Sequence, residues 1–160
     1  MLRLFDEAIE WMVARGQTAQ WGERPFSERP QNVERAEAWA ASGGLRVAEL
    51  AGEPVGILVL GDAYPWISPP AEPELYLQAL VTSRAHAGND VGGALVRRAY
   101  DEAREREIGL VRVDCWAGAP RLVRWYEEQG FTKTETFTVG DWPGQVFERR
   151  LYKSGSQPTR

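Results

Sequence analysis

Residues 87–93 bring three glycines together at the predicted start of an amphipathic helix. A helix N-terminus presents unpaired N–H groups and a partial positive charge, which together bind anions such as phosphate. Glycine lets the backbone approach such a ligand closely. The spacing matches neither a Walker loop nor a dinucleotide-binding loop. We therefore predict an anion-binding loop made of Ala87, Gly88, Asn89, Asp90, Val91, Gly92 and Gly93.

Asp90 places an acid in the middle of this loop. A carboxylate about 5 Å from a phosphate oxygen costs roughly 3 kcal/mol at an effective dielectric near 20. The helix terminus contributes only about 0.3–1 kcal/mol toward an exposed charge. Asp90 either opposes the anion directly or caps the helix and takes an N–H group for itself. In both cases we expect weaker anion binding than such a loop usually gives.

Side chains that could transfer protons lie on both sides of the loop. Tyr126 lies on a predicted helix, four residues before Gly130, and its phenol has an ordinary pKa of about 10. The alternative for Tyr126 is a core aromatic residue. Glu72 and Glu74 lie where a predicted strand begins, and Glu74 shares a face of that strand with Tyr76. The alternative for Glu74 is a solvated acid at a strand end.

The single cysteine and the single histidine favour structural roles. Cys115 lies in a predicted strand with Val111 and Val113, so we expect a small buried hydrophobic residue rather than a nucleophile. His86 lies in a polar turn, where a solvated histidine is expected. Two such residues are too few for a structural zinc site, and no metal is predicted.

The elements that position these residues follow from the hydrophobic periodicity. Helical spacing predicts helices over residues 2–15, 31–42, 91–107 and 120–129. Alternation and flanking turn residues predict strands over residues 45–50, 54–60, 74–81, 110–116, 131–139 and 146–152. Helices alternate with strands and the chain ends in a hairpin, so the predicted fold is α/β (α+β), a mixed sheet flanked by helices. We expect one domain over residues 1–153 and a flexible tail over residues 154–160.

Composition excludes several classes of function. The chain has 160 residues, of which 43% are hydrophobic and 26% charged, as expected for one soluble globular domain. The net charge of −4 without a basic tract argues against nucleic-acid binding. No run approaches the roughly 20 apolar residues of a membrane span. Asp6 and Glu7 stand where a signal peptide would be apolar, and one cysteine suits a reducing compartment, so a cytoplasmic location is predicted.

A strand, an anion-binding loop at a helix N-terminus and a tyrosine on the next helix suit acyl transfer from a coenzyme A thioester. The run from Glu74 to Phe131 resembles the GNAT superfamily of N-acetyltransferases, and the likeness covers most of the chain. The resemblance implies a twisted sheet whose fourth and fifth strands splay apart around the pantetheine arm. Family members usually begin with a strand before the first helix. Here either that edge strand is lacking or the natural start lies upstream.

The resemblance also implies where acetyl coenzyme A binds. The family loop reads Gln/Arg-x-x-Gly-x-Gly/Ala and holds the pyrophosphate. On this sequence Gly92 matches that pattern, whereas Ala87 replaces Gln or Arg and Asp90 replaces the first glycine. The backbone expected to pair with the pantetheine amides is that of Leu80, Val81 and Thr82.

Family likeness assigns the proton transfers as well. Tyr126 is expected to protonate the leaving thiolate, because a free thiol has a pKa of about 8.5. Glu74 is expected to accept the proton of the acceptor amine, directly or through water. Both roles carry the structural alternatives given above.

An aromatic acceptor pocket is the last expectation. Of seven tryptophans, three fall in predicted loops, where binding residues concentrate. The predicted substrate-binding residues are Trp21, Trp66, Tyr76 and Trp142. Such rings suit a planar or cationic amine. The alternative is that they cover the edges of the core.

Together these features predict acetyl coenzyme A-dependent N-acetylation of a small-molecule amine by direct transfer. A homodimer is a further expectation. Two other readings stay open. The chain could be a binding module that has lost tight cofactor binding, for which Ala87 and Asp90 are the evidence. It could also be a GNAT-fold enzyme with another acyl donor or none.

Overall fold

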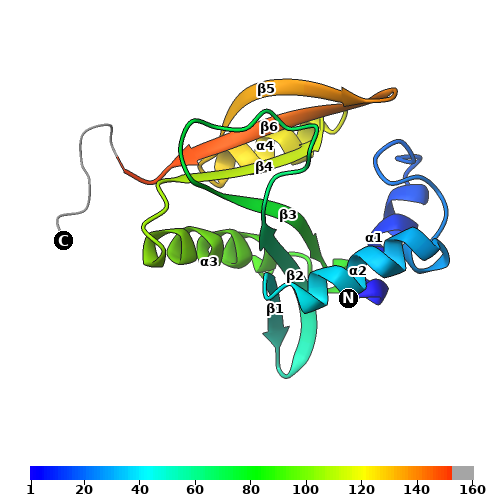
Figure 1. The fold of residues 1–160 in the computed structure, drawn as a ribbon. Coiled ribbons are helices and arrows are strands. Elements are labelled where there is room, and N and C mark those ends of the chain that lie inside the picture. The colour runs from blue at the N-terminus through cyan, green and yellow to red at the C-terminus, as the bar shows by residue number, and fades with distance from the viewer. Residues whose placement is uncertain (153–160) are drawn as a thin grey trace. The chain divides into compact units, whose positions relative to one another are not determined.

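The computed structural model describes residues 1–152 of the chain (Figure 1). The helices are α1 (Leu2–Val13), α2 (Pro30–Ala41), α3 (Val91–Glu105) and α4 (Pro120–Glu128), with short 3-10 helices at Phe26–Glu28 and Arg84–His86. The strands are β1 (Leu45–Leu50), β2 (Glu53–Gly61), β3 (Glu74–Thr82), β4 (Leu110–Trp116), β5 (Thr132–Val139) and β6 (Trp142–Arg150). The predicted tail, residues 154–160, lies outside the described residues. Within residues 1–152, no helix has the length and apolar character needed to span a bilayer.

The six strands form one mixed sheet in the order β1-β2-β3-β4-β6-β5. β1 and β2 are antiparallel, β3 and β4 are parallel, and β6 is antiparallel to both β4 and β5. Four helices flank this sheet, which confirms the predicted fold class. The connection between β3 and β4 runs through α3, as a parallel pair requires.

The chain packs as two compact units, and β3 passes from one to the other. The first unit comprises Met1–Leu60 and Ala79–Leu95, and the second comprises Gly61–Gln78 and the chain from Val96 onward.

The core of the first unit forms where α1 packs with α2 on β2. Side chains of α1 recur at helical spacing and are almost fully buried; they are Leu4, Phe5, Ala8, Ile9 and Met12. They contact Ile57 and Val59 of β2. Phe5 stacks on Phe26 with ring centroids 4.2 Å apart. The large ones, Leu4, Phe5, Ile9 and Met12, each stabilise the fold by about 1.5–3 kcal/mol.

In the second unit, β4 is buried and its two faces differ. Leu110, Val111 and Val113 are at most 2% exposed. Because opposite residues of neighbouring strands share a face, the register that pairs Val113 with Phe147 and Asp114 with Val146 puts Phe147 and Val146 on different faces. One face packs against the aromatic residues of α4, and the other carries a polar network.

The ladder between β3 and β4 is short. It contains four pairs, from Glu74–Leu110 to Leu77–Val113. β4 continues to pair with β6 as far as Trp116, whereas the rest of β3 has no partner in β4. This early end of the ladder is the separation of central strands that the sequence resemblance implied.

The final hairpin is longer than predicted. The sequence predicts a strand that begins at residue 146, after a loop over residues 140–144, but β6 begins at Trp142. Val139 pairs with Trp142, which leaves a two-residue turn with Gly140 at φ 58°. A turn of this length needs a left-handed residue at that position, and glycine adopts it without strain. Pro143 is tolerated within the strand and its carbonyl accepts a hydrogen bond from the amide of Ala117.

Candidate active site

The predicted anion-binding loop joins β3 to α3 within the first unit. The 3-10 helix Arg84–His86 leads into Ala87, and Gly88 has φ 90°, in the left-handed region that favours glycine. The side chain of Asn89 donates a hydrogen bond to the carbonyl of His86 (3.0 Å). His86 in turn lies 3.1 Å from the hydroxyl of Ser83 through its Nδ1, so this histidine is held by the loop rather than freely solvated. The loop is thus a compact turn that ends at the helix N-terminus.

Asp90 lies immediately before α3, in the left-handed region at φ 54°. This is the position at which the family pattern has its first glycine. The carbonyl of Asp90 accepts the first helical hydrogen bond, from Ala94 (3.0 Å). Its carboxylate lies over the first turn, because a Cβ built on Gly93 would come within 2.2 Å of Asp90 Oδ1. A side chain so placed occupies the position of a helix cap, where a bound anion would otherwise lie.

The strand that precedes the loop contains the three residues whose backbone is expected to pair with the pantetheine amides. Leu80, Val81 and Thr82 follow the last β3–β4 pair. On the face toward α3, a Cβ on Gly56 would lie within 3.4 Å of Val91, Leu95 and Thr82. Gly56 therefore allows the start of α3 to approach β2 closely, which fixes the loop relative to the end of β3.

Tyr126 lies on α4 in the second unit and is 5% exposed. Its ring packs against Trp125, Phe131 and Phe147, with centroids 5.0, 5.8 and 5.3 Å apart. Burial is the main cause that raises the pKa of Tyr126, and the nearby Cys115 and Asp114 raise it further. The phenol therefore keeps its proton throughout the neutral range and is present as an acid.

Cys115 shows how the surroundings of Tyr126 affect the pKa of a thiol. It is 6% exposed, which confirms the prediction of a buried hydrophobic residue. Burial, with a smaller contribution from Asp114, raises its pKa to about 12. A thiolate formed in such surroundings is far more basic than one in water, where the pKa is about 8.5. Because burial raises the pKa of the Tyr126 phenol as well, the surroundings give the proton transfer to sulfur no extra driving force, and the contribution of Tyr126 is a protonated donor held in place.

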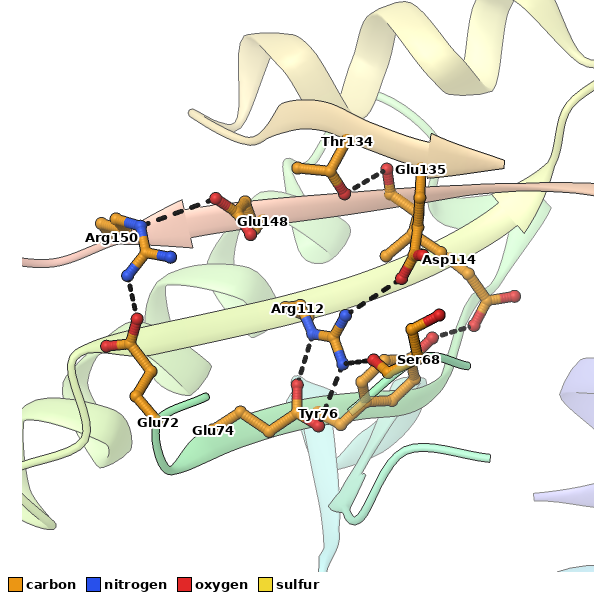
Figure 2. A network of polar contacts seen from close by, with 11 residues as sticks. Ser68, Glu72, Glu74, Tyr76, Arg112, Asp114, Thr134, Glu135, Glu148 and Arg150 are labelled. Carbon is orange, nitrogen blue, oxygen red and sulfur yellow. Dashed lines mark hydrogen bonds and ion pairs between the residues drawn. The ribbon is translucent and has the colours of Figure 1, made fainter. Parts of the chain in front are cut away.

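Glu74 is largely buried in an ion pair and is not the solvated strand-end acid that was the alternative to a catalytic base. Figure 2 shows Arg112 between Glu74 and Glu135. The Arg112 guanidinium donates to both Glu74 oxygens, at 2.5 and 3.2 Å, and to the Ser68 carbonyl at 2.9 Å. Arg112 and Glu74 side chains are only 5% and 12% exposed. Because both carboxylate oxygens accept from one guanidinium, Glu74 is arranged to hold Arg112.

A second carboxylate on the same face has different surroundings. Asp114 accepts a short hydrogen bond from the hydroxyl of Tyr76 (Figure 2). Burial raises the pKa of Asp114, and the hydrogen bond from Tyr76 opposes that rise. Asp114 keeps some exposed surface, whereas Tyr76 has none. Asp114 follows Val113, the last β4 residue paired with β3, so it stands where the two strands part.

The predicted substrate-binding tryptophans have three different environments. Trp21 contacts the core of the first unit, 5.4 Å from Phe5, so it covers the edge of that core. Trp142 lies in β6 and is 6.0 Å from Phe137. Trp66 is 46% exposed and stacks on Tyr64 at 4.9 Å with nearly parallel rings.

Tyr64 links this exposed stack to the polar face. Its ring lies edge-on to Tyr76, 6.2 Å away, and its hydroxyl donates to the carbonyl of Gln78 (2.7 Å). The Trp66–Tyr64 stack therefore stands beside the Tyr76–Asp114 pair, within one unit. Of the four predicted residues, the structure thus connects Trp66 and Tyr76.

Sequence reasoning missed Arg112 and Asp114, although a signal was present. Both lie in an otherwise apolar strand and alternate with Val111, Val113 and Cys115. Charged side chains at every second position of a buried strand must have partners, and so mark a buried polar network. No cluster of three or more potential metal ligands occurs among residues 1–152.

The acetyltransferase (GNAT) family matches residues 7–131, and the chain belongs to this family. It is an enzyme family, so the chain is placed among acetyltransferases.

Solved structures show the same fold at low sequence identity. A GNAT-family acetyltransferase from Listeria monocytogenes is 20% identical, with a TM-score of 0.70 over 92% of this chain and 85% of that one. A ribosomal-protein-alanine N-acetyltransferase from Brucella melitensis is 21% identical, with a TM-score of 0.66 over 94% and 91%. A putative acetyltransferase from Salmonella typhimurium, solved with acetyl coenzyme A, is 20% identical, with a TM-score of 0.63 over 96% and 91%. No curated protein matches the chain.

Proposed function

We propose that this protein transfers the acetyl group of acetyl coenzyme A directly to the amine of a small molecule. The observation that carries the proposal is the end of the β3–β4 ladder at Leu77 and Val113. Immediately beyond it, β4 presents Asp114 on one face and lies beside Tyr126 on the other. An acid and a base on opposite faces of one strand suit a reaction in which one group loses a proton and another gains one.

Asp114 is the base in this proposal and Tyr126 the acid. Asp114 accepts a proton from the amine as its nitrogen attacks the thioester carbonyl carbon. Tyr126 donates its proton to the sulfur as the carbon–sulfur bond breaks. The raised pKa of Asp114 suits a base, and the raised pKa of Tyr126 keeps the acid protonated. Glu74 is the base expected from the sequence; its two contacts with Arg112 favour a positioning role instead.

The Trp66–Tyr64 stack supports an acceptor that is small and planar or cationic. An exposed tryptophan held flat by a second ring offers a face to which a cation or a flat ring can bind. The loop that carries Tyr64 and Trp66 also places Ser68, whose carbonyl accepts from Arg112. The acceptor surface and the polar network are therefore coupled through one segment.

A protein amine is the second candidate acceptor. Two structural neighbours, from Brucella melitensis and Escherichia coli, are named as acting on ribosomal-protein alanine. Free-thiol release from acetyl coenzyme A should be measured with a panel of aromatic and aliphatic amines and with peptides that begin with alanine. We expect turnover with planar or cationic amines and loss of it in Trp66→Ala. Turnover with the peptides alone would overturn the small-molecule assignment, and absence of turnover with every amine would overturn the proposal.

Tyr126→Phe is expected to lower kcat about 30-fold at pH 7. Without the phenol the sulfur leaves as a thiolate, whose aqueous pKa of about 8.5 lies roughly 1.5 units above that pH. This difference is worth about 2 kcal/mol, and a barrier raised by that full amount slows the reaction about 30-fold. The ring contacts with Phe131 and Phe147 remain, so the melting temperature should change little. Stopped assays of thiol release measure the rate. An unchanged kcat would remove Tyr126 from the mechanism.

A further inference from the structure

Two arginines of the first unit share one aromatic ring. The guanidinium carbons of Arg15 and Arg84 each lie 4.0 Å from the centroid of the Trp11 ring. Cation–π attraction holds each guanidinium against the ring. Arg15 also donates a hydrogen bond to the carbonyl of Trp11 (3.3 Å). The ring thus keeps two positive charges near each other.

Neither arginine is neutralised by an acid in the part of the chain that the structure describes. The salt bridges of residues 1–152 include none with Arg15 or Arg84. Glu53, the acid beside this loop, contacts His86 (4.0 Å) and Arg3 (3.8 Å) instead. Burial, and to a smaller extent the charge of Arg15, lowers the pKa of Arg84. Both guanidinium groups are charged at neutral pH, and an anion would relieve their repulsion.

The pair stands beside the anion-binding loop. Arg84 opens the 3-10 helix that leads into this loop, three residues before Ala87, and α1 packs against that 3-10 helix. Ala87 is the position at which the family pattern has Gln or Arg. The loop therefore lacks a polar side chain at its usual position and has two unneutralised arginines next to it.

We propose that Arg15 and Arg84, held against Trp11, bind a phosphate group of coenzyme A and replace the side chain missing at Ala87. The inference rests on the proposed function, because coenzyme A must be the ligand. Guanidinium groups donate charge-assisted hydrogen bonds to phosphate oxygens, often two at a time. Because the ring restricts both side chains before the ligand arrives, less conformational entropy is lost on binding.

Calorimetric titration of Arg84→Gln and Arg15→Gln with coenzyme A tests the proposal. Each substitution is expected to raise Kd about tenfold at low salt, and the wild-type Kd should rise more steeply with salt than that of either variant. Arg84→Lys keeps the charge but not the planar group, and should fall between wild type and Arg84→Gln. Arg35→Gln is the matched control, because exposed Arg35 on α2 loses the same charge away from the ring.

Dephospho-coenzyme A, which lacks the 3′-phosphate, distinguishes the two phosphate sources. If the substitutions weaken coenzyme A but not the dephospho form, the pair binds the 3′-phosphate. If both ligands weaken alike, it binds the pyrophosphate, and either result supports the proposal. Equal Kd values for wild type, Arg84→Gln and Arg15→Gln would overturn it while leaving the proposed function intact. Absence of wild-type binding to both coenzyme A and acetyl coenzyme A would overturn the two together.

Discussion

Asp114→Asn is expected to lower kcat/KM at least about a hundredfold near neutral pH. General-base catalysis typically contributes about 10²–10⁴ in rate, and an amide cannot accept the proton of the amine. The variant should fold as well as wild type or better. Burial raises the pKa of Asp114, which means that the native fold disfavours its ionised form. Asparagine fills the same space, keeps an oxygen for the hydroxyl of Tyr76 and carries no buried charge.

The raised pKa of Asp114 also predicts how kcat/KM changes with pH. A base works only when deprotonated, so kcat/KM falls as pH drops through the pKa of the base. Because the pKa of Asp114 is raised, wild-type activity should be lost on the acid side at a higher pH than the ordinary aspartate value of about 3.9 would give. Asp114→Asn should lose this dependence together with most of its activity. Rates measured from pH 4 to 9, with a constant amine concentration, test both statements.

Glu74→Gln is the matched comparison, because it removes a different carboxylate of the same polar network. Arg112 is 4% exposed and would lose its main charged partner. Breaking a buried ion pair costs about 3–5 kcal/mol, so this variant should melt well below wild type. Its remaining folded fraction should keep the acid limb of the pH profile. If the acid limb of the pH profile is instead lost in Glu74→Gln and kept in Asp114→Asn, Glu74 and not Asp114 is the base.

The short-range features of this site could be predicted from the sequence because local residues determine them. The glycine loop, the start of α3 and the position of Tyr126 before Gly130 depend on backbone preferences and spacing within about ten residues. The β1–β2 turn at Ala51-Gly52 is of the same kind, with both residues in the left-handed region. Such features are specified locally and appear in the structure within one or two residues of their predicted bounds.

The polar face of β4 depends on contacts between residues far apart in the sequence, and the alternation within one strand does not predict them. Arg112 meets Glu74 across 38 residues of sequence and the Ser68 carbonyl across 44. Whether Glu74 is solvated or buried depends on which strand lies beside β3 and which loop covers it. The length of the final hairpin likewise depends on where β5 and β6 begin to pair. The residues from Gly140 to Gly144 do not by themselves determine that point.

Asp90→Gly is expected to tighten acetyl coenzyme A binding by about 10–100-fold. A carboxylate about 5 Å from a pyrophosphate oxygen opposes binding by roughly 3 kcal/mol at an effective dielectric near 20, and salt screening reduces that value. The carboxylate of Asp90 lies over the first turn of α3, close to Gly93, so this cost applies where an anion would bind. Calorimetric titration at two salt concentrations should show the larger gain at low salt.

The same substitution should change the stability of the fold little. Replacing a helix-capping side chain by glycine costs only a few tenths of a kcal/mol. Glycine also adopts the φ of 54° at this position without the penalty that other residues incur. Asp90→Asn removes the negative charge and keeps the shape of the side chain. Asparagine tolerates this conformation and still offers an oxygen to the helix. If charge opposes the ligand, Asp90→Asn should give most of the gain in affinity.

Gly93→Ala tests whether the Asp90 carboxylate lies where the structure places it. In wild type the new Cβ would come within 2.2 Å of Asp90 Oδ1, so the carboxylate must move and the variant should be destabilised. In the Asp90→Gly background that contact is absent, and alanine should be neutral or stabilise the helix by up to about 1 kcal/mol. Equal effects in both backgrounds would place the carboxylate elsewhere. Unchanged Kd values in Asp90→Gly and Asp90→Asn would show that the acid does not compete with coenzyme A, because a competing charge cannot be removed without changing affinity.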